Sequence, residues 1–224
     1  MSGVVIFETM RVRGGRLPLL DAHVARLRRA AGMVGLPAVP DALREEAVEK
    51  ARTGGDRILR LAWSAAGAGW SERPLEDPAA WRVRTVAEPH PGYPVKTEDR
   101  AAFDRALAEA RQAEADEPLL STPTGTVVEG ARFAVAWVEG DELCYPDPGL
   151  GGLPSVGLAR LLVVAAEAGV RTRAAWVTVA GLNGLPAGLV NAARGPVRVT
   201  ALDGRPVPPS DLLGGLAERF WPSA

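Results

Sequence analysis

The apolar positions in the first half of the chain alternate between the spacing of a β-strand and that of an α-helix. Residues 4–12 are rich in apolar and β-branched residues and end at the turn signal RGG, which is typical of a strand. After Asp21, a favourable N-cap, apolar residues recur at helical spacing until GLPAVP interrupts them. These patterns predict strands at 4–12, 57–65 and 81–87, and helices opening at Asp21, within 40–52 and at 98–114.

The second half of the chain has shorter apolar runs, separated by glycine and aspartate turns. Four runs, at 118–122, 126–130, 132–138 and 142–145, predict strands, with EGDE at 139–142 as a hairpin turn. We expect further strands at 171–179 and 196–202, helices at 157–168 and 210–219, and an irregular glycine-rich stretch before the last strand. The mixture predicts an α+β fold in two lobes, residues 1–115 and 119–224.

Composition and charge exclude several classes of function. The 224 residues carry a net charge of −1 without a basic stripe, so we expect no nucleic-acid partner. A single cysteine, Cys144, excludes an intramolecular disulfide, and two histidines are too few for a multi-histidine metal site. No apolar run has membrane-spanning length and the N-terminus lacks a signal-peptide pattern, so we expect a cytoplasmic protein without a membrane partner.

Lysine is scarce in this chain, which makes each lysine a candidate for special chemistry. Of the 26 lysines and arginines, two are lysines, Lys50 and Lys96, and 24 are arginines. Arginine supplies charge and hydrogen-bond donors but does not lose its proton, whereas lysine can do so and form a Schiff base. Lys96 lies in the turn segment PGYPVKTEDR between two predicted elements. The alternative is an ordinary solvated surface lysine.

Three further positions combine with Lys96 into one type of site. Arg26 follows His23 by one helical turn, Glu129 ends an apolar strand before a glycine, and Gly157 opens a helix whose amides can bind an anion. Each also has an ordinary explanation: a solvated helix face, an ion pair with an arginine, or a hydrated helix end. Together they match the needs of pyridoxal phosphate, namely covalent capture, an anchored phosphate and a protonated ring nitrogen.

The order of these segments resembles the fold-type IV pyridoxal-phosphate enzymes, the class IV aminotransferase family. The similar blocks are FETMRVRGGRLPLLDAHVARLRRAAGMVGLP, VKTEDR, DEPLLSTPTGTVVEG, GLAR and VNAARGPVRV, which together cover nearly the whole chain. The resemblance implies a small N-terminal α/β lobe, a larger C-terminal β-rich lobe and a site at their junction, usually in a homodimer. We therefore expect a homodimer that acts on a small amino substrate.

The resemblance also implies a role for each matching position. Lys96 would carry the cofactor and act as the catalytic base, and Glu129 would pair with the pyridine nitrogen. The positions that would bind the phosphate are Arg26, the backbone amides of Leu158 and Ala159, and the loop of Asn191 and Ala192. Arg11 and Arg100 match positions that are often basic in lyase-like members, and one of them would meet a substrate carboxylate. No metal is expected.

Four positions depart from the family pattern. Ala159 stands where the family often has threonine, and Ala192 where it has serine or threonine. A hydrogen bond to a charged group contributes about 1.5–3 kcal/mol, so the loss of two hydroxyls predicts weaker phosphate binding. Asp99 and Ala134 each replace an asparagine, near the lysine and after the glutamate, which bears on how the substrate is bound.

The chain begins almost on the FET block, like the short members of the family, many of which resemble lyases of folate biosynthesis. We therefore expect a lyase that converts 4-amino-4-deoxychorismate into p-aminobenzoate and pyruvate. The first alternative is an aminotransferase for branched-chain or D-amino acids, which would use Lys96 for the same proton transfers. The second is a catalytically inactive member that acts as a binding protein without a cofactor, which the missing phosphate hydroxyls suggest.

Overall fold

The computed structural model describes residues 3–75 and 80–222, which form two compact units. Unit 1 comprises Met1–Asp77 and Val95–Asp99, and unit 2 comprises Pro78–Pro94 and Arg100–Ala224. The five residues 95–99, which include Lys96, therefore belong to unit 1 although unit 2 flanks them in sequence. The division expected at 115–119 falls inside unit 2, because α3 (Ala101–Gln112) packs against β4 (Ala80–Thr85) and β5 (Glu117–Ser121) of that unit.

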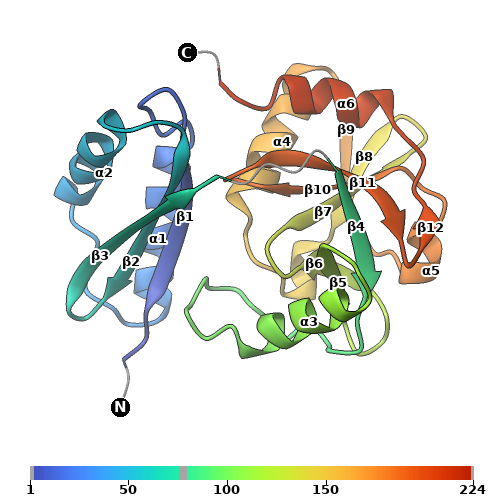
Figure 1. Ribbon diagram of the computed structural model, residues 1–224, viewed down its shortest axis with the longest axis horizontal. Helices are drawn as coiled ribbons and strands as arrows, with labels where there is room; N and C mark the ends of the chain where they lie inside the picture. The colour runs from blue at the N-terminus through green and yellow to red at the C-terminus, as the bar shows by residue number, and fades with distance from the viewer. Residues whose placement is uncertain (1–2, 76–79, 223–224) are drawn as a thin grey trace. The chain divides into compact units, whose positions relative to one another are not determined.

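Unit 1 is a three-stranded antiparallel sheet with two helices on one face (Figure 1). The strands, in spatial order, are β1 (Ile6–Val12), β2 (Arg57–Ser64) and β3 (Gly67–Pro74), and the helices are α1 (Leu20–Met33) and α2 (Ala42–Arg52). The core is formed by alternate residues of β1 and β2 and by the apolar stripes of both helices. Asp21 is not the N-cap of α1: Leu19 takes that position, and Asp21 lies in the first turn.

Strand β3 was not expected from the sequence. Its residues are GAGWSERP, and their side chains are exposed or only half-buried, so they lack the apolar alternation of a strand with one buried face. Pairing with β2 along its whole length, from Gly67 against Ser64 to Pro74 against Arg57, holds it in the sheet. Backbone hydrogen bonds to the well-packed strand β2 therefore stabilise β3, although its own side chains bury little apolar surface.

Unit 2 is built on a mixed sheet with the strand order β6-β5-β4-β11-β10-β7-β8-β9, and β12 pairs with β11. Its remaining strands are β6 (Val127–Gly130), β7 (Ala134–Glu139), β8 (Glu142–Pro146), β9 (Arg171–Ala175), β10 (Ala187–Asn191), β11 (Gly195–Leu202) and β12 (Arg205–Pro206). The helices besides α3 are α4 (Val156–Glu167), α5 (Val179–Leu182), α6 (Asp211–Glu218) and the 3-10 turn η1 (Pro148–Leu150). Helices α4 and α6 pack against each other and against β11 (Figure 1).

The predicted elements of unit 2 are confirmed, with differences at their ends and in two stretches; β12, α5 and η1 were not predicted. The stretch expected to be irregular contains β10, which is held between β7 and β11 although Gly188 and a short apolar run give it little strand signal. The strand expected at 171–179 ends at Ala175, because Thr178 caps α5 by accepting a hydrogen bond from the amide of Gly181. No helix among the described residues is long and apolar enough to cross a membrane.

Candidate active site

Lys96 is fixed beside the first strand of unit 1. The amide of Phe7 donates to the Lys96 carbonyl at 2.9 Å, and the amide of Glu98 donates to the Val5 carbonyl at 3.0 Å. The segment 95–99 thus runs antiparallel along the start of β1, and Lys96 Nζ lies 4.8 Å from the centroid of the Phe7 ring. The lysine singled out by its rarity is therefore held by backbone pairing in a defined place, unlike a side chain on a free loop.

A buried carboxylate in unit 1 binds His23 and Arg26 of helix α1. Glu8 on β1 accepts from Arg26 through Nε at 2.7 Å and Nη2 at 2.5 Å, and from His23 Nδ1 at 2.6 Å. One helical turn separates His23 from Arg26, so α1 presents both to the same strand. The Glu8 and His23 side chains are each 2% exposed, and that of Arg26 is 11% exposed.

The electrostatics of this cluster favour an ionised Glu8. Burial raises the pKa of Glu8, but the charge of Arg26 and the hydrogen bonds with His23 and Arg26 outweigh burial and hold this pKa at about 2. Burial lowers the pKa of His23, and the hydrogen bond with Glu8 opposes that effect. Because an ionised carboxylate can only accept, His23 Nδ1 carries the proton. Its Nε2 is a buried acceptor without a hydrogen-bond partner among the described residues.

Glu8 was not among the residues predicted from the sequence, although the pattern of strand residues around it indicates a buried carboxylate. Strand residues two apart point to the same face, so Glu8 shares a face with Ile6, Met10 and Val12, which are at most 2% exposed. A carboxylate on an otherwise apolar, buried strand face needs a partner. Arg11 lies on the opposite face of β1, where its Nη2 is 3.5 Å from Asp56 Oδ2. The alternation therefore separates Arg11 from the Glu8 cluster.

Glu129 lies at the second candidate cluster, in unit 2. It is 7% exposed near the end of β6, and its Oε1 accepts two hydrogen bonds. One comes from His90 Nε2 at 2.8 Å and the other from the amide of Leu153 at 3.1 Å. Oε2 accepts no hydrogen bond from the residues that the structure describes, so it can accept one from a protonated ring nitrogen. The ordinary alternative, an ion pair between Glu129 and an arginine, is not present among the described residues; a histidine and a backbone amide are the partners instead.

The N-terminus of α4 packs backbone to backbone against the loop after β10. A Cβ atom at Gly157 would lie 2.5 Å from the carbonyl carbon of Asn191 and 2.8 Å from the amide nitrogen of Ala192, so only glycine fits. Two segments that the sequence proposed separately for phosphate binding thus meet in space. The start of α4 and the loop after β10 are therefore in direct main-chain contact.

The hydrogen bonds at the start of α4 and in the Asn191 loop differ in part from those expected for a free phosphate-binding site. The amide of Leu158 donates to Ser155 Oγ at 3.1 Å, and that of Ala159 donates to the Ser155 carbonyl at 3.0 Å. Both amides are therefore engaged in the helix cap. The side chain of Asn191 forms its own turn, accepting from the amides of residues 193 and 194. Ser155 was not singled out in the sequence, and it places a hydroxyl at the start of α4.

Arg100 is used within unit 2. Its Nη2 donates to the carbonyl of Ala131 at 2.5 Å, and its guanidinium lies 4.7 Å from the centroid of Phe103 and 5.7 Å from that of Tyr93. These contacts tie the start of α3 to the turn that follows β6. The arrangement is typical of an arginine that stabilises the fold.

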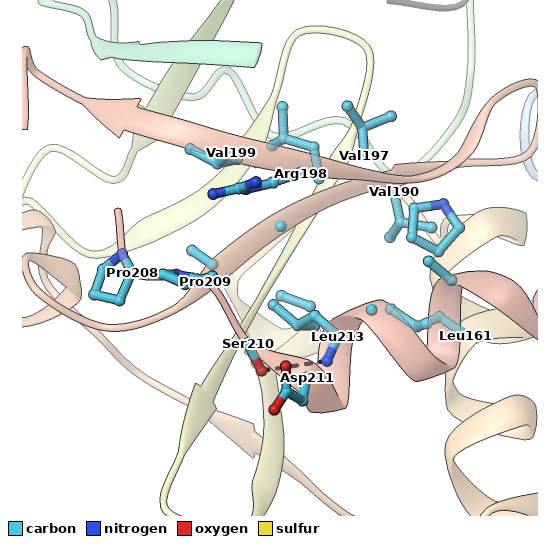
Figure 2. A pocket seen from close by; sticks show the side chains of 17 residues that line it. Leu161, Val190, Val197, Arg198, Val199, Pro208, Pro209, Ser210, Asp211 and Leu213 are labelled. Atoms are coloured by element: carbon cyan, nitrogen blue, oxygen red, sulfur yellow. Dashed lines mark hydrogen bonds between the residues drawn. The ribbon is translucent and has the colours of Figure 1, made fainter. Parts of the chain in front are cut away.

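An apolar cavity of about 270 Å³ lies elsewhere in unit 2 and includes none of the predicted site residues (Figure 2). Leu161, Val190, Arg198 and Leu213 are among the residues around it, and Ser210 Oγ accepts from the amide of Leu213 at 3.3 Å at its edge. Glycines and alanines of β10, β7 and α6 also line it. The cavity is therefore a packing space beneath α6 and not part of the candidate site. No group of three potential metal ligands occurs among the described residues.

The fold and the two clusters define a class of protein. The model of the class IV amino-transferase family matches residues 5–202, so the chain belongs to this family, and the resemblance read from the sequence is confirmed. The mixed α and β architecture agrees with that of solved family structures.

Comparison with solved structures identifies individual proteins that this chain resembles. A proposed 4-amino-4-deoxychorismate lyase is 30% identical, with a TM-score of 0.85 over 99% of this chain and 91% of that chain. A hypothetical aminotransferase from Mycobacterium tuberculosis, in a form bound to pyridoxal phosphate, is 25% identical, with a TM-score of 0.88 over 98% and 88%. The branched-chain aminotransferase from Thermoproteus uzoniensis, with norvaline, is 21% identical and shares the fold, with a TM-score of 0.90 over 98% and 84%. No curated protein sequence matches the chain significantly.

Proposed function

We propose that this chain is a pyridoxal-phosphate-dependent lyase that converts 4-amino-4-deoxychorismate into p-aminobenzoate and pyruvate. The observation that carries the choice of substrate is the 30% identity to a proposed lyase for this substrate, which extends over nearly the whole of both chains. The two products together contain all the atoms of the substrate, so the reaction needs no second substrate. That property separates it from transamination.

Residues of unit 2 fit the cofactor in two respects. Glu129 is a buried carboxylate with Oε1 held by two donors, and Oε2 accepts no hydrogen bond from the described residues. Gly157 brings the N-terminus of α4, an end that favours anions, into main-chain contact with the loop at Asn191 and Ala192. The first matches a pyridinium nitrogen and the second a phosphate group.

In this proposal each residue has a defined task. When bound, pyridoxal phosphate supplies an electron sink that stabilises a carbanion next to the substrate's amino group. Lys96 holds the cofactor through Nζ, takes the proton from the substrate carbon at this atom and returns one to the leaving fragment. Glu129 Oε2 holds the proton on the ring nitrogen. Arg26 and the positive end of the α4 dipole bind the phosphate, and the Ser155 hydroxyl is a further donor that the alanines at 159 and 192 do not supply.

Glu8 and the two remaining arginines complete the assignment. Glu8 orients Arg26 through two parallel hydrogen bonds, which fixes the plane of the guanidinium. Arg11 is the candidate for binding a substrate carboxylate. Arg100 already donates to the Ala131 carbonyl and lies over two aromatic rings, so we assign it to the fold.

The second candidate function is transamination of a branched-chain or D-amino acid. The observation that favours it is the similarity to the aminotransferase from Mycobacterium tuberculosis, which is spread over nearly the whole chain. The two reactions would use the same lysine and the same carboxylate, so the site residues do not separate them. The products do: a lyase releases pyruvate from 4-amino-4-deoxychorismate alone, whereas an aminotransferase needs a 2-oxo acid as acceptor.

The first experiment compares wild-type protein, Lys96→Ala and Lys50→Ala, each mixed with pyridoxal phosphate. We expect a visible absorption band that borohydride abolishes in the wild type and in Lys50→Ala, and no such band in Lys96→Ala. Lys50 is a matched control because it lies half-buried on α2, in an ion pair with Glu46, and is not one of the proposed site residues. An absent band in all three proteins would remove both enzymatic functions and favour a cofactor-free binding protein. If the band is present, a pyruvate assay with and without a 2-oxo acid distinguishes the lyase from the aminotransferase.

A further inference from the structure

His90 is a buried, immobilised histidine in the loop between β4 and α3. Its side chain is 2% exposed, and its ring meets that of Phe103 edge-on, with the centroids 5.7 Å apart. Its own amide donates to the carbonyl of Ser121 at 2.8 Å, which ties the loop to the end of β5. Nothing in the sequence marked this residue, because a lone histidine in the loop segment PHPGYP carries no periodic signal.

The hydrogen bonds of His90 define which of its ring nitrogens carries the proton. The amide of Gly92 donates to Nδ1 at 3.2 Å, so Nδ1 is an acceptor, and an imidazolium has no acceptor. The proton therefore sits on Nε2, which donates to Glu129 Oε1 at 2.8 Å. Gly92 has φ +73°, a left-handed backbone conformation that glycine adopts without strain and that returns its amide toward the ring.

A second loop contributes the other donor to the same oxygen. The amide of Leu153 reaches Glu129 Oε1 at 3.1 Å, and Gly152 allows this approach. A Cβ atom at Gly152 would lie 3.1 Å from Val128 Cγ1 and 3.8 Å from Glu129 Cδ. The carboxylate can therefore not rotate about its terminal bond without breaking two hydrogen bonds at once. Its orientation is fixed from both sides, and Oε2 is the oxygen that remains for a ligand.

We propose that His90 is a positioning residue that holds Glu129 so that Oε2 meets the ring nitrogen of the cofactor. This inference rests on the proposed binding of pyridoxal phosphate. A neutral donor suits the task, because it orients the carboxylate while leaving its negative charge to stabilise the protonated ring nitrogen. An arginine in the same place would neutralise that charge.

The test is a thermodynamic cycle between His90 and the ring nitrogen. Wild type, His90→Leu and His90→Gln are each titrated with pyridoxal phosphate and with its 1-deaza analogue, in which a C–H group replaces the ring nitrogen. Dissociation constants come from absorbance or fluorescence. We expect His90→Leu to weaken binding of pyridoxal phosphate roughly tenfold or more, as for a lost hydrogen bond to a charged group. Binding of the deaza analogue should change by less than about threefold, because the analogue lacks the nitrogen through which His90 acts.

Two further variants separate positioning from folding. His90→Gln places an amide donor near the position of Nε2, so it should restore pyridoxal phosphate binding to within about threefold of wild type. In a Glu129→Gln background, His90→Leu should have little further effect, since both changes act on the same contact. Thermal unfolding of each variant shows whether the protein is folded during the titrations.

Four outcomes would overturn the inference, and they are distinguishable. Equal weakening of both cofactors by His90→Leu indicates a purely structural role, as does a failure of His90→Gln to restore binding in a folded protein. Unchanged binding of both cofactors shows that His90 has no influence on Glu129. If wild-type protein binds neither cofactor, the proposed function itself fails, and this inference fails with it.

Discussion

The two units each bury one carboxylate with a histidine, yet the two pairs differ in what else they contain. Glu8 in unit 1 is bound by the Arg26 guanidinium through two hydrogen bonds, as well as by His23. Glu129 in unit 2 is bound by His90 and by a backbone amide, with no cation among the partners that the structure describes. Glu8 therefore neutralises and orients an arginine, whereas Glu129 keeps its charge and one acceptor oxygen for a ligand. The identity of the second partner decides whether the charge of a buried carboxylate is neutralised within the protein.

The largest expected effect comes from removing the charge of Glu8. Glu8→Gln would leave Arg26 buried without its counter-ion, which typically costs about 3–5 kcal/mol of unfolding free energy. Urea unfolding at pH 7, followed by circular dichroism, measures this difference. The control is Asp41→Asn, which removes an exposed ion pair with Arg28 and should change the free energy by less than about 1 kcal/mol. Equal effects of the two substitutions would contradict the distinction between a buried and an exposed pair.

The pH dependence of stability tests the same carboxylate without changing the partners of Arg26. The pKa of Glu8 is lowered from 4.5 to about 2 in the folded protein, so its contribution is fully present above about pH 4.5. That contribution, on the order of 3 kcal/mol, is lost as the pH falls from 4.5 toward 2. The wild type should therefore lose more unfolding free energy over this range than Glu8→Gln. Parallel pH profiles of the two proteins would show that Glu8 is not responsible.

Glu129→Gln should have the opposite balance of effects. The amide oxygen of glutamine can still accept from His90 and Leu153, so the unfolding free energy should stay within about 1 kcal/mol of wild type. The amide nitrogen of glutamine cannot accept a hydrogen bond from a protonated ring nitrogen. Binding of pyridoxal phosphate should therefore weaken at least about tenfold. Urea unfolding and a cofactor titration of the same preparation give both numbers. A variant that unfolds as readily as Glu8→Gln would remove the contrast between the two carboxylates.

The smallest expected effect concerns the backbone donor to Glu129. In Gly152→Ala the new Cβ lies 3.1 Å from Val128 Cγ1, so the Val128 side chain or the loop must shift by a few tenths of an ångström, and a shift of the loop moves the Leu153 amide with it. We expect binding of pyridoxal phosphate to weaken severalfold and stability to fall by about 1 kcal/mol. Gly214→Ala on α6 is the control, since its Cβ meets nothing within 4 Å and should raise stability by about 0.5–1 kcal/mol. Unchanged cofactor affinity in Gly152→Ala would show that His90 alone is sufficient.

Many of the helices and strands could be predicted because each shows as a regular spacing of apolar residues over a short stretch of sequence. The helix that carries Arg26 and the strand that carries Glu129 both follow from apolar periodicity, and both are present. Strands β3 and β10 could not be predicted in this way. The first has almost no buried side chains, and the second is short and contains Gly188, so both depend on pairing with neighbouring strands.

The candidate site shows the same division between what is local and what is not. Lys96 stood out because one of two lysines in the chain lies between structured segments, and Glu129 and Gly157 because a strand end and a helix start are themselves local features. Pairing between distant residues was invisible: His90 lies 39 positions from Glu129, and Glu8 lies 18 positions from Arg26. A sequence without related sequences beside it gives residue types and local periodicity, but not which distant side chains meet.

The sequence by itself thus determined the family, most of the elements and the candidate residues Lys96, Arg26 and Glu129. Tertiary structure alone decided how that chemistry is arranged within each unit: a guanidinium and His23 on Glu8, and His90 with the Leu153 amide on Glu129. The physical reason is the distance along the sequence over which each kind of interaction acts. Backbone propensity and hydrophobic periodicity act over a few residues, whereas burial brings together groups from distant segments and requires each buried polar atom to find its partner there.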